Sequence, residues 1–354
     1  MKQKSKWIGL AVLLLVIAAV AGYLAFGQAT KVVTLHGYVG GEKIGLLEDT
    51  EVESILKSKY RLALDYSKAG SLDMVTADHT GQDFLFPSSQ TALEYYQQQY
   101  GSPVKSEIIF NTPLVLYSHR AVVQALVANG MVREENGSYY MDMNELAAAL
   151  ENGTKWSELG VSALYGAFGV NTTDPAKSNS GNMFAGLLAN VLCGGVADAQ
   201  SVDAVLPRLQ RIFQSLGYME TSSADLFEQF LKTGMGAKPL VAGYESQLLE
   251  FAVENPDDWA KISDDIVMLY PTPTVWSTHI YIALDEAGKA AVDALLDADV
   301  QRLAWEKHGF RTGVSGTATD VTHFHVPGIL AEVTQVVPMP SYAAMDKIIG
   351  ALGG

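Results

Sequence analysis

Short runs of β-branched and aromatic residues recur along the chain, and each is followed by a loop of small residues and then a helical pattern. Residues 32–35 predict a first strand that ends at a glycine cluster, and residues 61–66 predict a second strand. Residues 84–86 predict a third, followed by a turn at 87–89 and a helix that closes at Gly101. This alternation is typical of α/β layers around a mostly parallel sheet.

Two predicted helices begin at residues with helix-capping patterns. Thr50 and Glu53 have the spacing of a capping box. Ser178 or Ser180 precedes a periodic apolar stretch, so a helix is predicted to begin near Gly181. The first N–H groups of a helix lack intrahelical partners and its dipole places partial positive charge there, which makes this start a candidate anion site. Ordinary capping without a ligand is the alternative interpretation.

Two longer β-rich runs divide the chain. One covers residues 106–119 and contains Pro113, and the other covers residues 264–284 and contains Pro271 and Pro273. Both are predicted to cross between two lobes. Four helical patterns lie between them, each closed by a glycine at or near its C-cap.

These crossings define the predicted domains. Residues 31–110 plus 275–354 form the first α/β lobe, and residues 111–274 form the second. A helical stretch at 285–308 and a last helix at 341–352 are expected to rejoin the first lobe.

The N-terminus predicts a membrane segment. Three lysines in residues 1–6 precede 21 residues without a charge, 7–27. A membrane span needs about 20 apolar residues, whereas the apolar region of a cleaved signal peptide has roughly 7 to 15. Residues 1–29 are therefore expected to hold an uncleaved single-pass anchor in the cell membrane, with residues 30–354 outside the cytoplasm. Cleavage near Ala29, which would release a secreted protein, is the alternative.

Composition narrows the possible functions. The 354 residues are 48% hydrophobic, which is enough for a packed core, and the net charge of -15 disfavours nucleic acid as a partner. Cys193 is the only cysteine, so the chain has no intramolecular disulfide and no multi-cysteine metal site. Common nucleotide, hydrolase and zinc-protease motifs are missing from the sequence. No cofactor and no metal ion are expected.

Taken in order, several segments resemble one family: "YSKAGSLDMV", "FPSSQTALEYY", "FNTPLVLYS", "TDPAKSNSG", "GYESQLLEF", "YPTPTVWSTHIYIAL" and "QRLAWEKHGFR". The chain resembles bacterial extracellular solute-binding proteins of the type II periplasmic-binding-protein-like kind, which includes molybdate, sulfate and phosphate binders. The resemblance covers most of residues 31–350. It implies two α/β lobes, joined by two crossover strands, that close on a ligand held by hydroxyl groups and by amides at helix starts.

The resemblance also implies a ligand site. Its residues would be Gly40, Gly41, Ser71, Ser88, Ser89, Thr173, Asp174, Ser178, Ser180, Gly181, Tyr244 and Glu245. Asp174 and Glu245 would repel a full oxyanion, so a cationic, zwitterionic or metal-complexed ligand stays open beside an oxyanion or a carboxylate. Lys43 and Lys68 are candidates to balance a ligand charge, although isolated lysines are more often solvated.

The implied function is a membrane-tethered receptor, not an enzyme, that presents a small ligand to an ABC permease or a membrane sensor. One alternative is an extracellular interaction or adhesion module with a vestigial cleft. Another is an anchored serine hydrolase of the penicillin-binding type, suggested by the motifs at 54–57, 180–182 and 232–234. Against it, Ser54 falls inside a predicted helix and 232–234 ends one, whereas this chemistry needs the serine at a helix start.

Overall fold

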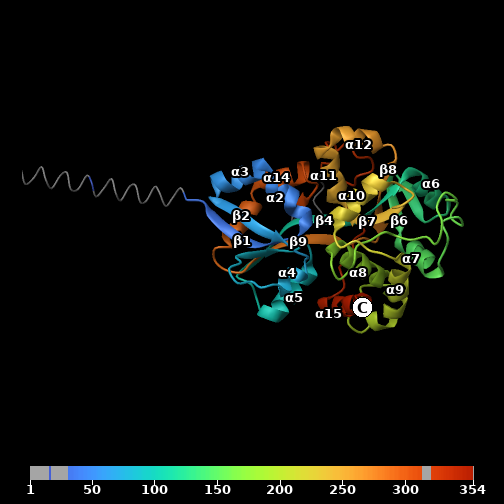
Figure 1. Cartoon of the computed structure of the whole chain (residues 1–354), viewed down its shortest axis with the longest axis horizontal. Coiled ribbons are helices and arrows are strands. Elements are labelled where there is room, and N and C mark those ends of the chain that lie inside the picture. The colour runs from blue at the N-terminus through green and yellow to red at the C-terminus, as the bar shows by residue number, and fades with distance from the viewer. Residues whose placement is uncertain (1–15, 17–30, 313–319, 354) are drawn as a thin grey trace, which may run out of the picture.

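Strand β4 (Lys105–His119) belongs to both halves of the molecule, a computed structural model that describes residue 16 and residues 31–312 and 320–353. The first part of β4 pairs with β9 (Trp276–Ala283), and the last part pairs with β7 (Leu240–Tyr244) and β8 (Ile266–Thr272). Figure 1 shows the two lobes side by side, with β4 at their junction.

The first lobe is built on the strand order β2–β1–β3–β9–β4. Strand β1 (Val33–Val39) is parallel to β2 (Leu62–Lys68) and to β3 (Phe84–Phe86), and β9 is antiparallel to β3. A short strand, β10 (Arg311–Thr312), also pairs with β4. The helices of this lobe are η1 (Gly41–Lys43), α2 (Ile44–Glu48), α3 (Thr50–Lys59), α4 (Asp73–Thr76), α5 (Gln90–Tyr100), α13 (Ala290–Leu295) and α14 (Ala298–Glu306).

The second lobe is built around β7, β8 and the hairpin of β5 (Val132–Glu135) and β6 (Ser138–Asp142). Asn136 and Gly137 at the turn both have positive φ, as a tight two-residue hairpin requires. The helices of this lobe are α6 (Arg120–Ala128), α7 (Met143–Asn152), α8 (Asn179–Cys193), α9 (Val202–Leu216), α10 (Ser223–Thr233), α11 (Glu245–Glu254) and α12 (Pro256–Ile262).

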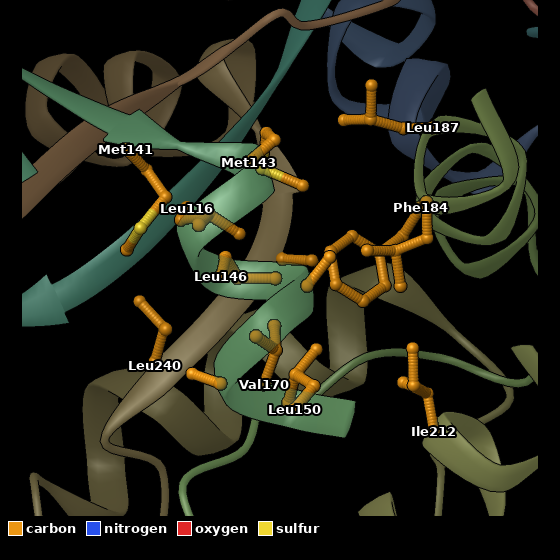
Figure 2. Packing of buried hydrophobic residues seen from close by; sticks show 14 of the residues in the cluster. Leu116, Met141, Met143, Leu146, Leu150, Val170, Phe184, Leu187, Ile212 and Leu240 are labelled. Carbon is orange, nitrogen blue, oxygen red and sulfur yellow. The ribbon is translucent and has the colours of Figure 1, made fainter. Parts of the chain in front are cut away.

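Helix α8 lies at the centre of the second-lobe core. Phe184 and Leu187 are fully buried among Met143 and Leu146 of α7 and Ile212 of α9, as Figure 2 shows. Every residue from 180 to 190 on α8 is buried, so this helix is surrounded by protein on all sides. Such burial explains why its sequence is apolar around most of its circumference.

Most predicted elements are present, with two local differences. The N-cap of α3 is Asp49, not Thr50, because its Oδ1 accepts hydrogen bonds from the amides of Glu51 (2.7 Å) and Val52 (3.3 Å). The second crossing run is two strands, β8 in one sheet and β9 in the other.

The last helix, α15 (Tyr342–Leu352), differs from its predicted place. The sequence assigned residues 275–354 to the first lobe, but Met345 and Ile348 of α15 are fully buried in the second-lobe core with α8 and α9. Figure 1 shows α15 beside these two helices. Its beginning contacts the first lobe, where the ring of Tyr342 stacks on that of Tyr95 with the ring centroids 4.8 Å apart.

The predicted membrane segment, residues 7–27, lies outside the described residues except for Val16. Among the residues that the structure does describe, no helix is both long enough and apolar enough to cross a membrane.

Replacing Met345 by alanine tests the position of α15. Because the side chain is fully buried against the second lobe, we expect Met345→Ala to lower the free energy of unfolding by about 2–5 kcal/mol. Asp346→Ala, at an exposed position on the same helix, should change it by less than about 0.5 kcal/mol. Urea unfolding measures both, and equal small effects would contradict the packing of α15.

Candidate ligand-binding cleft

A cavity of about 390 Å³ lies between the two lobes. The loops that follow β1 and β2 form one wall, and the segments that lead into α8 and α10 form the other. Its lining residues are Gly40, Gly41, Glu42, Lys68, Ala69, Gly70, Ser71 and Asp73 from the first lobe, and Lys177, Ser178, Asn179, Thr221, Ser222, Ser223, Ala224 and Asp225 from the second. We call this cavity the cleft.

The first-lobe wall follows from the parallel sheet. Strands β1 and β2 are parallel neighbours, so the loops after them meet at the same edge. The Lys68 side chain lies against Gly41, since a Cβ atom there would lie 2.5 Å from Cε of Lys68. Ser71 supports the next loop, since its Oγ accepts a hydrogen bond of 3.0 Å from the amide of Ser88.

The second-lobe wall contains two helix starts. The N-caps are Ser178 for α8 and Ser222 for α10, and neither hydroxyl caps its own helix. In α8, the amide of Gly181 already donates to Thr173 Oγ1 (2.7 Å) and the amide of Asn182 donates to the Ser178 carbonyl (3.0 Å). The serine hydroxyls and the positive ends of two helix dipoles therefore border the cleft.

A buried polar cluster supports the floor of the first lobe. Lys43 is fully buried, and its Nζ donates to Glu42 Oε1 (2.6 Å) and to Ser88 Oγ (2.6 Å). The Ser88 hydroxyl in turn donates to the Glu42 carboxylate. Nδ1 of His279 lies 3.2 Å from Lys43 Nζ. Gly40 covers the cluster, because a Cβ there would be 2.5 Å from the Glu42 carboxylate.

The pKa values of this cluster show how its charges are balanced. Burial raises the pKa of Glu42, but the opposing effects of Lys43, His279 and the two hydrogen bonds lower it to about 2. Burial lowers the pKa of Lys43 and, together with the Lys43 charge, holds the pKa of His279 well below its usual value. The neutral His279 ring therefore accepts a hydrogen bond from the Lys43 ammonium, and the Lys43–Glu42 ion pair carries no net charge.

The two lobes touch at one end of the cleft. Asn179 Nδ2, at the start of α8, donates to the Ser88 carbonyl of the first lobe (2.9 Å) and to the Tyr244 hydroxyl (3.1 Å). At Gly70 of the first lobe, a Cβ atom would lie 3.0 Å from the Lys177 carbonyl of the second. Asn179 is thus a direct polar bridge across the lobe junction.

No family model matches this chain, and no curated protein matches by sequence. Solved structures match over nearly the whole length. A substrate-binding protein of an ABC transporter from Agrobacterium tumefaciens has a TM-score of 0.58 at 14% identity, covering 92% of this chain and 94% of that one. A periplasmic thiamin-binding protein has a TM-score of 0.61 at 10% identity, covering 91% and 95%.

A third match, described as an extracellular solute-binding protein from Bordetella parapertussis, has a TM-score of 0.57 at 12% identity and covers 90% of this chain and 96% of that one. This chain has the fold of the periplasmic solute-binding proteins. The predicted resemblance is confirmed for the fold.

The solute-binding fold brings part of the predicted site together. Gly40, Gly41, Ser71 and Ser178 line the cleft. Ser88 and Ser89 instead line a second cavity of about 420 Å³, which also includes Trp276, Met183 and Met339. Since Asn179 reaches the Ser88 carbonyl, Ser88 lies between the two cavities.

Other predicted residues lie behind the cleft wall. Thr173 and Ser180 are fully buried, and their hydroxyl oxygens are 2.8 Å apart. Gly181 permits close packing, since a Cβ there would be 2.0 Å from the Thr173 carbonyl oxygen. Asp174 Oδ1 accepts from the amide of Ala176 (2.8 Å). These residues shape the loop before α8.

Tyr244 and Glu245 also lie outside the cleft lining. The Tyr244 hydroxyl accepts from Asn179, as described above. The Glu245 carboxylate is fully buried and held by Arg311, with Nε–Oε2 at 2.6 Å and Nη2–Oε1 at 2.8 Å, and by the Tyr270 hydroxyl at 2.5 Å. The sequence suggested that Glu245 would repel an anionic ligand. Because Arg311 neutralises the Glu245 carboxylate inside the protein, this repulsion is removed.

Several cleft residues were missed by the sequence analysis. Lys177 and Asn179 line the cleft and belong to the segment "TDPAKSNSG", but only other residues of this segment were predicted to bind the ligand. Lys43, which does not line the cleft, was expected to be solvated and is fully buried. It follows a strand, two glycines and Glu42, and this position was the available signal, since loops at strand ends form sites in α/β folds.

The lysines of the penicillin-binding motifs have other partners. Lys57 pairs with Glu53 at 2.5 Å on α3, and Lys232 pairs with Glu228 on α10. Ser54 is exposed on the side of α3. Each lysine is thus part of an exposed ion pair within its own helix.

Replacing Glu42 tests the buried ion pair through pH. The pKa of Glu42 is about 2 in the folded protein against 4.5 for the free side chain, so its stabilisation is complete above about pH 4.5 and is lost as pH falls towards 2. We expect the difference in unfolding free energy between wild type and Glu42→Gln to be largest near neutral pH and to shrink by about 3 kcal/mol between pH 4.5 and 2.

Urea unfolding across this pH range is the measurement. Glu134→Gln, which removes an exposed carboxylate, should stay close to wild type throughout. A difference between wild type and Glu42→Gln that does not depend on pH would contradict the paired, buried state of Glu42.

Removing the Asn179 side chain tests the lobe bridge. Asn179→Ala deletes the hydrogen bond to the Ser88 carbonyl, which joins the two lobes, so an arrangement with the lobes further apart should become more populated. Small-angle X-ray scattering should then give a larger radius of gyration than for wild type. Asn144→Ala, at an exposed position on α7, is the control, and identical scattering from both variants would show that the bridge does not hold the lobes.

Proposed function

We propose that this chain is an extracytoplasmic solute-binding protein that captures a small polar ligand in the cleft and takes no part in covalent chemistry. The observation that carries the proposal is the interlobe cavity of about 390 Å³, into which both lobes present polar groups. Its volume falls within the range of about 300–1,000 Å³ that is usual for small-molecule sites. The matched structures with this fold are described as binding proteins, which supports a binding role.

The charges of the cleft indicate the class of ligand. Lys68 of the first lobe and Lys177 of the second are exposed side chains on opposite walls, and two helix starts add partial positive charge. Asp73 and Asp225 also line the cleft. We infer that the ligand carries an oxyanion or carboxylate group, which the lysines and the helix starts would bind. It also carries hydrogen-bond donors, from which the aspartates would accept.

Closure is the proposed mechanism. A ligand that contacts Lys68 and Lys177 at once binds the closed arrangement better than the open one, and so shifts the population towards closure. Asn179 already donates a hydrogen bond to the Ser88 carbonyl at the junction, so the two lobes are in contact there. A permease of the ABC type or a membrane sensor would then recognise the closed shape.

Membrane tethering is part of the proposal on the basis of the sequence. The 21 uncharged residues at 7–27 have the length of a span, and the lysines before them favour the orientation with the lobes outside the cytoplasm. A tethered receptor stays near its transporter or sensor.

A ligand screen tests the function. Melting temperature is measured against oxyanions, carboxylates, amino acids, sugars and metal ions, and one class should give a large increase, because a ligand at about 100 times its Kd adds roughly 2.7 kcal/mol. Lys68→Gln and Lys177→Gln should each reduce that increase. Lys232→Gln, an exposed lysine on α10, should retain it.

The screen also separates the alternatives. If no compound shifts the melting temperature, the interaction module with a vestigial cleft becomes the better hypothesis. A shift that Lys68→Gln and Lys177→Gln leave unchanged would place the ligand outside the cleft.

A further inference from the structure

We propose that Glu250, Glu254 and His308 form a binding site for a divalent transition-metal ion that joins the two lobes outside the cleft. Glu250 and Glu254 belong to α11 of the second lobe, and His308 lies between α14 and β10 of the first. None of the three lines the cleft.

The potential ligand atoms of the three side chains lie close together. One imidazole nitrogen and one oxygen from each carboxylate all lie within 4.8 Å of one another. His308 Nδ1 is 2.6 Å from Glu250 Oε1 and 4.0 Å from Glu254 Oε1. The two glutamates are four residues apart on α11, so they share one face of the helix.

The other ring nitrogen of His308 has its own carboxylate. Asp49 Oδ2 lies 3.4 Å from Nε2 and is held in place by Lys307 Nζ at 2.9 Å. A histidine that ligates a metal through one nitrogen commonly donates its other N–H to a carboxylate, which sets the tautomer and the ring orientation. Asp49 is positioned to play this part, so Nδ1, which faces Glu250, is the nitrogen that would bind the metal ion.

The backbone makes room for the donors. A Cβ atom at Gly45 would lie 2.4 Å from Glu250 Oε1 and 3.7 Å from His308 Nδ1. A side chain at this position would therefore push the carboxylate away from the ring. Gly45 completes a cradle around the converging atoms.

Carboxylates outnumber cationic side chains around these atoms. Asp49, Glu51, Glu250 and Glu254 each pair with Lys307 or His308, and the guanidinium of Arg302 also interacts with Glu51. This excess of negative charge favours a bound cation.

The site has an entrance and suits a particular class of ion. The side chain of His308 is 1% exposed, whereas that of Glu254 is 50% exposed, so an ion can enter past Glu254. One imidazole and two carboxylates are a donor set that Zn²⁺ accepts, with bonds of about 2.0–2.2 Å and a further position for water. Mg²⁺ prefers an all-oxygen shell and dehydrates reluctantly. We therefore expect Zn²⁺ to bind more tightly than Mg²⁺.

Isothermal titration of the full chain without an affinity tag tests the site, using ZnCl₂ and MgCl₂ in turn. Zn²⁺ should bind at one site per chain, and Mg²⁺ should bind at least about tenfold more weakly. Glu254→Gln and His308→Gln should each abolish this binding event. Asp49→Asn, which keeps a good N-cap for α3, should weaken it by roughly 10–100-fold.

Glu228→Gln removes an exposed carboxylate from another helix and is the matched control, so it should bind Zn²⁺ like wild type. Glu254 is half exposed, so its variant should fold even if His308→Gln does not. The proposal is overturned if wild type binds no Zn²⁺, or if Glu254→Gln binds it with unchanged affinity and stoichiometry. The response of the cleft ligand is measured on the same variants and should persist in Glu254→Gln, which keeps the two proposals separable.

Discussion

The hydrogen bonding of β4 is the constraint on which the rest of the molecule depends. Up to Pro113 this strand pairs with β9 in the first lobe, and from Leu114 onward it pairs with β7 and then β8 in the second. A polar contact on each side secures the crossing: Thr112 Oγ1 accepts from the amide of Ser246 (3.1 Å), and the Thr274 hydroxyl donates to the Leu114 carbonyl (2.6 Å). Both lobes are therefore held relative to one strand.

Buried charge is concentrated where the lobes meet. The Lys43–Glu42 pair supports the cleft floor, and the Arg311–Glu245 pair connects β10 of the first lobe with α11 of the second. Burying an unpaired charge there would greatly reduce the stability of the fold, so each charged side chain of these two pairs has a hydrogen-bonded partner of opposite charge. These pairs leave Lys68 and Lys177 as exposed cationic side chains of the cleft lining, in a protein whose net charge is -15.

The local order of elements was largely predictable from sequence. The apolar runs and glycine stops correctly located β1 to β4 and the helices α7 and α8, since these signals act over a few residues. Gly153 and Gly194 take the left-handed conformation that their places after α7 and α8 require. The candidate site was predicted only in part, because Ser71 and Ser178 line the cleft whereas Thr173 and Ser180 face each other inside the wall.

By itself, the amino-acid sequence determined the alternation of strands and helices, the two crossing runs and the small-residue loops at strand ends, because each depends on neighbours close along the chain. Only the tertiary structure decided that α15 packs on the second lobe, that Arg311 neutralises Glu245 across 66 positions, and that His308 meets Glu250 across 58. The physical reason is that burial and ion pairing depend on distance in space. A pattern of residue types does not specify which distant side chain will supply the opposite charge.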